Sequence, residues 1–143
     1  MKKVAIVGCG RMGAFTSEGV LRHAPKCWFP LSHAESVLAH GNLEISALAD
    51  TDTVMLHKAA AHYGVARTYT DFNALIEENS LDLLCLATRT PGRADMIAKA
   101  YHAGVMAIHA EKPLCNTTQE LRELASLFAR DDFHFTWGAI RRH

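Results

Sequence analysis

The sequence predicts an α/β fold, in which a doubly wound parallel sheet of the Rossmann type forms a single domain. Three observations lead to this prediction. Short apolar runs alternate with segments whose apolar residues recur at helical spacing. Helix-capping residues and terminal glycines separate the two kinds of segment. A glycine-rich turn, which contains Gly8, Gly10 and Gly13, directly follows the first apolar run.

The composition excludes several classes of protein. A sequence of 143 residues that is 49% hydrophobic has enough apolar material for one core. The 15 basic and 15 acidic residues balance, so neither nucleic acid nor a membrane surface is an expected partner. No apolar window reaches the ~18 residues of a transmembrane helix. Because Gly8 and Arg11 interrupt the first apolar run, we expect no signal peptide and a cytoplasmic location.

The sequence predicts no metal site. His57 and His62 are five residues apart on a predicted helix, so they do not share the face that a metal pair needs. His109 is expected to pack in the core or at a buried edge. The cysteines are too far apart for a paired-ligand zinc motif, and we expect buried or free thiols at Cys9, Cys27, Cys85 and Cys115.

The elements of the first half follow from periodicity and caps. Residues 4–7 are a short buried strand, and a helix is expected from Gly13 to about Arg22, with Val20 and Leu21 facing the sheet. Residues 23–42 are too long for an ordinary loop. A capping box from Ser32 to Glu35 predicts a short helix there, which ends at Gly41. Residues 43–49 form the second strand.

The remaining elements continue the alternation. Thr51 or Asp52 caps a helix that ends at Gly64, and a strand over residues 65–69 leads to a helix capped by Asp71. Residues 81–87 form the clearest buried strand. A helix over residues 94–101 precedes a strand over residues 105–110. A capping box at Thr117 then begins a helix that runs to residue 128, and residues 133–137 form the last strand.

The glycine turn predicts a dinucleotide site. Gly8 permits the reversal after the strand, Gly10 lets the backbone approach a pyrophosphate, and Gly13 allows close packing of the next helix. The amides of the turn, including those of Cys9, Arg11 and Met12, would face the anion. We propose no nucleophile at Cys9, where a small side chain suffices. The alternative is an ordinary tight turn, which also favours glycine.

Asp50 is the expected partner of the adenosine ribose. It ends the second strand, where a carboxylate can accept hydrogen bonds from the 2′ and 3′ hydroxyls and would repel a 2′-phosphate. With Thr51 next to it and no adjacent arginine, NAD is predicted in preference to NADP, although Arg11 leaves NADP possible. The alternative is that Asp50 or Asp52 caps the next helix. Asp50 also lies further from the glycines than the usual ~20 residues, and residues 23–42 must absorb the difference.

Four motifs together resemble the Gfo/Idh/MocA family, the relatives of glucose-fructose oxidoreductase and inositol dehydrogenase. They are the glycine turn, the Ala49-Asp50 strand end, the Thr90-Pro91 turn, and the run from Ala103-Gly104-Val105 to Glu111-Lys112-Pro113-Leu114. The resemblance implies an NAD(P)-dependent oxidoreductase that acts on a sugar, inositol or related polyol. It also implies a Rossmann domain that is followed by a second α/β domain.

The resemblance also implies roles for individual residues. Lys112 would be the catalytic residue, beside the nicotinamide and the substrate hydroxyl. Glu111 would hold the nicotinamide ribose and position Lys112, while Pro113 would follow a cis peptide bond. The end of the fourth strand would run under the cofactor and contact it through Ala87, Thr88, Arg89, Thr90 and Pro91.

Two departures from the family pattern matter. Asp95 stands where many relatives have a histidine, so no role is transferred to it. The resemblance covers residues 2–142, which is less than half of a typical member. The second domain, with most of the substrate pocket, is not in the sequence, and residues 137–142 resemble the run that leads into it.

The leading functional hypothesis is therefore the nucleotide-binding domain, residues 1–143, of a dehydrogenase. It would transfer hydride between the nicotinamide and a secondary alcohol or ketone of a sugar or polyol. Alone it should bind the cofactor but scarcely turn over substrate. The alternatives are a stand-alone NAD-binding module without catalysis, and a truncated remnant whose exposed edge drives self-association into a homo-oligomer.

Overall fold

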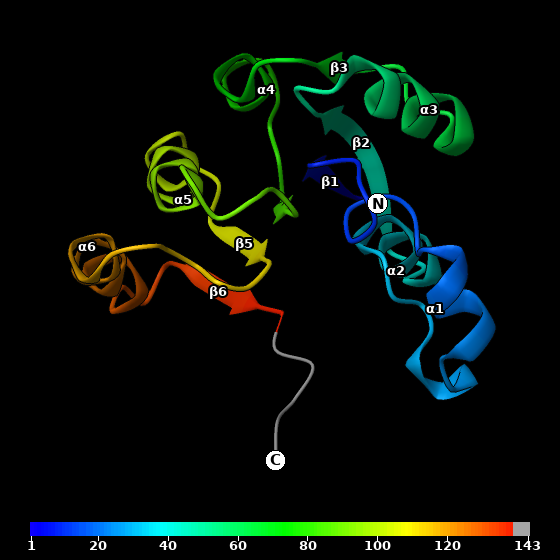
Figure 1. The fold of residues 1–143 in the computed structure, drawn as a ribbon. Coiled ribbons are helices and arrows are strands. Elements are labelled where there is room, and N and C mark those ends of the chain that lie inside the picture. The colour runs from blue at the N-terminus through cyan, green and yellow to red at the C-terminus, as the bar shows by residue number, and fades with distance from the viewer. Residues whose placement is uncertain (139–143) are drawn as a thin grey trace.

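A single parallel sheet organises the computed structural model, which describes residues 1–138 (Figure 1). Its strand order is β3-β2-β1-β4-β5-β6, and every neighbouring pair is parallel. The order reverses between β1 and β4, as the predicted Rossmann-type sheet requires, so the fold class is confirmed. The strands are β1 (Lys2–Val7), β2 (Leu43–Ala49), β3 (Thr68–Tyr69), β4 (Leu83–Leu86), β5 (Ala107–Ala110) and β6 (His134–Trp137).

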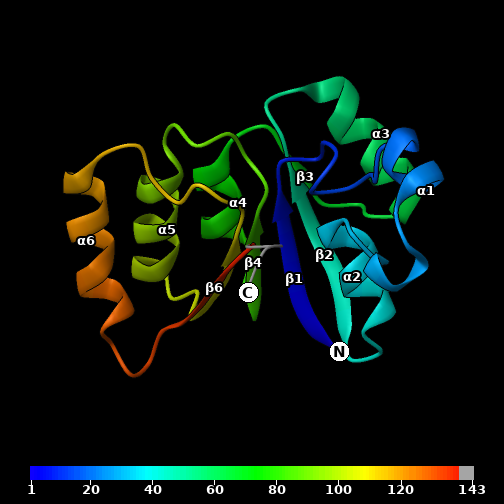
Figure 2. The same cartoon turned by 60° about the horizontal axis from the view of Figure 1, so that its bottom comes forward.

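Helices cover both faces of the sheet (Figure 2). Helices α4, α5 and α6 lie on one side, and α2 and α3 lie on the other. None of the helices in residues 1–138 combines the length and the apolar character that crossing a bilayer requires. The helical segments are α1 (Glu18–His23), the 3-10 turn η1 (Lys26–Trp28), α2 (His33–Ala39), α3 (Thr53–Tyr63), α4 (Phe72–Glu78), α5 (Arg93–His102) and α6 (Thr118–Phe128).

Alternation along the strands divides the core into two layers. In β1, Ala5 and Val7 face α4, α5 and α6, whereas Val4 and Ile6 face α2 and α3. All four side chains are buried, because a parallel sheet is covered on both faces. This arrangement leaves the carboxyl ends of the strands as the edge at which loops can form a site.

The prediction of a helix from Gly13 to about Arg22 is wrong. One helical turn follows the glycines, where Ala14 donates to the carbonyl of Gly10, and α1 begins four residues later at Glu18. The intervening carbonyls already have other partners. The amide of His33 donates to Met12, the amide of Ala34 donates to Gly13, and the hydroxyl of Tyr63 donates to Ala14. A helix needs these carbonyls for its own ladder, so it cannot continue past this turn.

The helix expected to cover the sheet here is replaced by α2. Its residues Ala34 and Val37 are buried against β1 and β2, whereas α1 buries no residue. Val20 and Leu21 were predicted to face the sheet, but they are 39% and 52% exposed. Residues 23–42, which were predicted to be an insertion, therefore supply the helix that packs on the sheet. Helix α1 lies on the outer side of α2 (Figure 1).

Most predicted helix ends are confirmed. The capping boxes at Ser32 and Thr117 both form, Asp71 caps α4, and Gly64 ends α3 with a left-handed φ of 67°. The predicted stop at Gly41 differs, because α2 ends at Ala39 with His40 as its C-cap, and Gly41 has no left-handed φ. The later strands are shorter than expected, at two residues in β3 and four in each of β4, β5 and β6. The predicted run into a second domain, beyond Gly138, lies outside the described residues.

Candidate functional site

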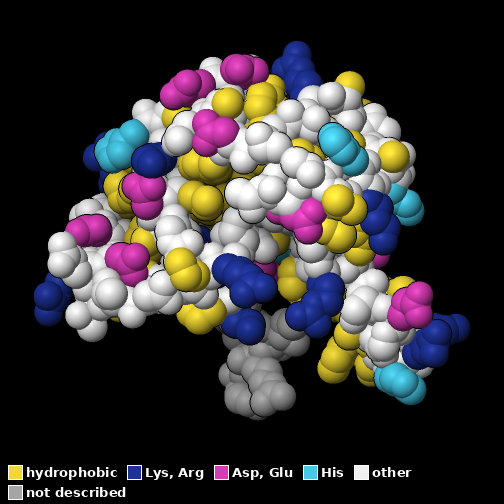
Figure 3. All heavy atoms as spheres, turned by 45° about the horizontal axis from the view of Figure 1, so that its top comes forward, with side chains coloured by type: hydrophobic (Ala, Val, Ile, Leu, Met, Phe, Trp, Pro, Cys, Tyr) yellow, Lys and Arg dark blue, Asp and Glu magenta, His cyan; other side chains and the backbone are white. Residues whose placement is uncertain are grey.

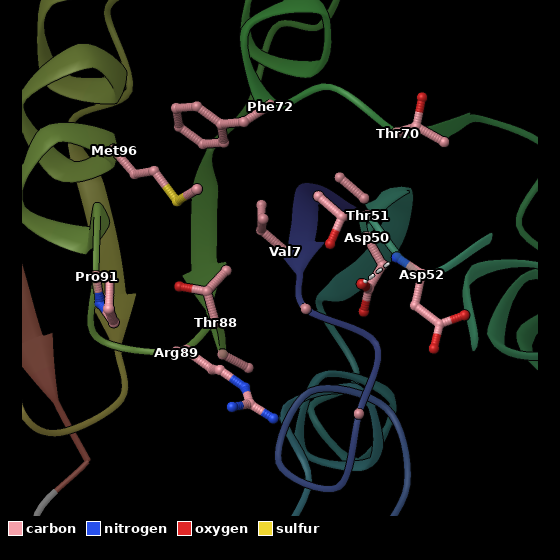
Figure 4. A pocket seen from close by; sticks show the side chains of 14 residues that line it. Val7, Asp50, Thr51, Asp52, Thr70, Phe72, Thr88, Arg89, Pro91 and Met96 are labelled. Atoms are coloured by element: carbon pink, nitrogen blue, oxygen red, sulfur yellow. Dashed lines mark hydrogen bonds between the residues drawn. The ribbon is translucent and has the colours of Figure 1, made fainter. Parts of the chain in front are cut away.

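A cavity of about 480 Å³ opens at the carboxyl ends of β1, β2 and β4. Asp50 and Thr51 line one side of it, and Thr88 and Arg89 line the other (Figure 4). The convergence of these separate loops confirms that their strands end at one edge of the sheet. The predicted site residues that line this cavity are Gly8, Gly10, Asp50, Thr51, Ala87, Thr88, Arg89 and Pro91.

The surroundings of Gly8, Gly10 and Gly13 differ in how much room they leave for a side chain. Gly8 has a φ of 92°, and a Cβ there would lie 2.8 Å from the main chain of Ala87. A Cβ on Gly13 would lie 1.6 Å from the carbonyl oxygen of Gly8, so the turn folds back on itself. A Cβ on Gly10 would meet nothing within 4 Å, and Gly10 lines the cavity. Gly8 and Gly13 thus close the turn, whereas Gly10 leaves open space beside it.

The turn also presents unpaired amides. Within residues 1–138, the N–H groups of Gly10, Arg11, Met12 and Gly13 donate to no carbonyl and to no side chain. Consecutive free amides at the start of a helical turn carry a partial positive charge and form a concave anion site. The amides do not depend on a long helix, so the wrong prediction for residues 13–22 leaves the anion site intact.

Asp50 is fixed by two main-chain amides. Its carboxylate accepts from the amide of Cys9 at 2.6 Å and from the amide of Asp52 at 2.9 Å. The capping role belongs to Asp52, whose side chain accepts from Val54 and Met55 at the start of α3. A carboxylate oxygen has room for more than one hydrogen bond, so Asp50 can still accept from a ligand in the cavity.

Cys9 is buried within the core and does not line the cavity. Burial, together with the negative charge of Asp50, raises the pKa of its thiol to about 12. The thiolate is the reactive form of cysteine, so this side chain is chemically inert at neutral pH. The main chain of Cys9 contributes by binding Asp50.

Lys112 lies in a neighbouring cavity of about 370 Å³, on the other side of the glycine turn. The two cavities share this turn, because Gly10 lines the first, and Arg11 and Met12 line the second. Lys112 is exposed, and the peptide bond to Pro113 is cis. Figure 3 shows Lys and Arg side chains spread over this face of the molecule, with a small group of them near its lower middle. Arg89 in the first cavity and Arg11 with Lys112 in the second give this region the charge that suits an anion.

Glu111 lines neither of these cavities. Its carboxylate accepts a hydrogen bond from His33 at 3.1 Å and lines a third cavity, next to α2. This hydrogen bond, more than the opposing effect of burial, lowers the pKa of Glu111 below its usual range. Glu111 therefore remains ionised and is held by α2.

Arg93 joins two of the predicted site loops and was not predicted from the sequence. The residue is 2% exposed, and its guanidinium donates to the main-chain carbonyls of Thr88, Glu111 and Pro113. Burial lowers the pKa of the guanidinium below its usual value, which the charge of Glu111 opposes. The contacts join the loop after β4 to the residues on either side of Lys112. The only signal for this role in the sequence is a charged residue in the first turn of a predicted helix.

Six residues that line the first cavity were not predicted as site residues: Val7, Ala49, Asp52, Thr70, Phe72 and Met96. Thr70 and Phe72 follow β3, and Met96 lies on α5 (Figure 4). Thr70 directly follows a strand, so the rule that ligands gather at carboxyl ends could have found it. Phe72 and Met96 lie on helices at apolar positions, where core packing is the ordinary expectation.

Comparison with known proteins gives one family. The model of the Gfo/Idh/MocA oxidoreductase family, described as having an NAD-binding Rossmann fold, matches residues 2–138. The D-apiose dehydrogenase of Paraburkholderia graminis is 28% identical over 128 residues, which are 90% of this chain and 29% of that protein.

Solved structures agree on the fold. The myo-inositol 2-dehydrogenase of Lactobacillus plantarum has a TM-score of 0.77 at 25% identity, over 96% of this chain and 36% of that one. The scyllo-inositol dehydrogenase of Lactobacillus casei, solved with NAD(H) and scyllo-inositol, has a TM-score of 0.76 at 19% identity, over the same shares. The chain spans 29% of the curated relative and 36% of each of these two structures.

Proposed function

The chain belongs to the Gfo/Idh/MocA oxidoreductase family with an NAD-binding Rossmann fold, and from this premise we propose that it serves a sugar or polyol dehydrogenase. The reaction would move hydride between the nicotinamide and a secondary alcohol or ketone. The substrates named for its relatives, D-apiose and inositols, support this class.

The observation that carries the proposal is the row of unpaired amides beside the open space at Gly10. A diphosphate needs several N–H donors and a close approach to the backbone, and this turn offers both next to a cavity. The residues present thus fit the cofactor. In our proposal, the turn holds the diphosphate, while the loop from Ala87 through Thr90 to Pro91 borders the nicotinamide half.

Asp50 would hold the adenosine ribose. The amides of Cys9 and Asp52 orient its carboxylate, which leaves oxygen lone pairs for the 2′ and 3′ hydroxyls. A 2′-phosphate would meet two negative side chains here, Asp50 and Asp52, which both line the cavity. We therefore expect NAD to be preferred over NADP.

Lys112 would act at the reacting oxygen. The chemistry that the bound cofactor would supply is a hydride acceptor for the alcohol carbon, as NAD⁺, or a hydride donor for the carbonyl carbon, as NADH. In our proposal, the Lys112 ammonium donates a hydrogen bond to the substrate oxygen and stabilises the negative charge that develops there. Arg93 supports this position, because it binds the carbonyls of Glu111 and Pro113 on either side of the lysine.

Titration of the chain with NADH and NADPH, followed by nucleotide fluorescence, tests the proposal. We expect saturable binding that is tighter for NADH. Asp50→Ala should weaken NADH binding by about 10- to 100-fold, since it removes hydrogen bonds to a charged acceptor. Gly10→Val should weaken it by at least about tenfold, because the side chain would occupy the open space beside the turn.

Asp71→Ala is the matched control. Like Asp50, Asp71 accepts hydrogen bonds from two main-chain amides, but it does not line the cavity, so NADH binding should remain at the level of the unaltered chain. If Asp50→Ala and Gly10→Val both bind NADH as well as Asp71→Ala does, the cofactor site proposed here is wrong.

A further inference from the structure

Three side chains that can ligate a metal meet between α2 and β5. They are His33, His109 and Glu111, and their ligand atoms all lie within 4.8 Å of one another. His33 is 6% exposed, and the Glu111 side chain is 13% exposed. The sequence predicted no metal site, from the spacing of His57 and His62 and of the cysteines, and His33 was not considered because it lies far along the chain from the other two residues. The fold brings the three together.

The backbone holds both ligand-bearing segments in place. The first amides of α2, those of His33 and Ala34, donate to the glycine turn at 2.8 and 2.9 Å. The amide of Glu111 donates to the carbonyl of Leu86 at 2.9 Å, and His109 pairs with Cys85 in the sheet. The ligands therefore come from regular elements and hydrogen-bonded ends rather than from a free loop, which favours a preorganised site.

The donor set suits a borderline transition metal. Two imidazoles and one carboxylate are typical ligands of Zn²⁺, and two ligands at ~2.0 Å from a tetrahedral ion are roughly 3.3 Å apart. His33 Nε2 and Glu111 Oε1 are separated by 3.1 Å, which matches this spacing. His109 Nδ1 lies 2.8 Å from the hydroxyl of Thr136, which leaves Nε2 for a metal. A second hydrogen bond of this kind is usual for histidines that bind metals.

Space for a further ligand is present. The same three side chains line a cavity of about 480 Å³, together with Cys85 and Thr136. This cavity is different from the one that contains Asp50. An ion here would keep an open coordination position toward the cavity, as three-ligand zinc sites do.

We propose that His33, His109 and Glu111 form a Zn²⁺ site that joins α2 to the end of β5. The site is separate from the proposed cofactor function and does not require it. Arg93 binds the main-chain carbonyl of Glu111 and adds a nearby positive charge. We therefore expect a dissociation constant in the roughly micromolar range, weaker than that of a closed structural zinc site.

The test uses the tag-free chain after treatment with a chelator. Co²⁺ is added while visible absorption is recorded, and Zn²⁺ then competes for the site. We expect one equivalent of Co²⁺ to bind with the intense bands of a tetrahedral site, and Zn²⁺ to displace it. His33→Gln and His109→Gln should each weaken binding by more than about tenfold, and Thr136→Val by about tenfold.

His57→Gln is the matched control, because His57 is an exposed histidine on α3 and should not affect binding. Glutamine is chosen at position 33 because its amide can still donate a hydrogen bond to Glu111. Far-UV circular dichroism checks that each variant is folded. The proposal is overturned if a folded His33→Gln variant binds Co²⁺ like the unaltered chain. It is also overturned if the unaltered chain shows no saturable one-equivalent binding. NADH titration of the same samples reports on the cofactor site independently.

Discussion

Gly13→Ala is expected to abolish NADH binding and to destabilise the chain by about 3 kcal/mol or more. The new Cβ would lie 1.6 Å from the carbonyl oxygen of Gly8 and 2.8 Å from its carbon. Both are main-chain atoms, so no side chain can rotate away to relieve the overlap. The turn would have to open, which would move the free amides apart. Urea denaturation followed by circular dichroism measures the loss of stability.

Gly19→Ala provides the comparison, because a Cβ on Gly19 in α1 would meet nothing within 4 Å. Alanine also favours a helix more than glycine does, so this variant should be as stable as the unaltered chain, or more stable by up to about 1 kcal/mol. If the two variants had equal stability and equal NADH affinity, the close approach of Gly13 to the carbonyl of Gly8 would not be needed for the turn.

Arg93→Met is the second substitution with a large expected effect. The buried guanidinium donates to three main-chain carbonyls, from Thr88, Glu111 and Pro113, which methionine would leave without these donors. A buried acceptor without a partner costs about 1–3 kcal/mol, so we expect a loss of roughly 3–5 kcal/mol in the free energy of unfolding. Amide hydrogen exchange should also become faster on both sides of Lys112, because the two loops are no longer joined.

Arg22→Met controls for the removal of an arginine. Arg22 is exposed and pairs with Glu18 on α1, where such ion pairs contribute at most about 1 kcal/mol. The free energies of unfolding of the two variants, measured by urea denaturation, should therefore differ clearly. A stability of Arg93→Met within 1 kcal/mol of Arg22→Met, with unchanged exchange near Lys112, would contradict the role assigned to Arg93.

The parts of the fold that depend on neighbouring residues could be predicted from the sequence. Helix caps at Ser32, Asp71 and Thr117 act within three residues, and the structure contains each of them. The first helix could not be predicted in this way. Its end depends on Tyr63 and on the start of α2, which bind the carbonyls after the glycine turn from far along the chain.

The same distinction applies to the candidate site. The parallel sheet alone predicts that the loops after β1, β2 and β4 meet, and they line one cavity. The sequence could not show that Lys112 and Glu111, which are neighbours in the chain, would line different cavities. It also could not show that Arg93 and His33 would bind the segment around them, because these contacts depend on tertiary packing.

The central claim is that a dinucleotide lies across the carboxyl ends of β1, β2 and β4. Amide chemical-shift mapping with ¹⁵N-labelled chain and added NAD⁺ tests it most directly. The claim predicts that the largest shifts occur at the free amides of Gly10 to Gly13, at Thr51, and at Thr88 and Arg89. It would be contradicted if these amides remained unchanged at saturating NAD⁺, or if the largest shifts lay in α6 and β6, away from β1 and β2 in the strand order.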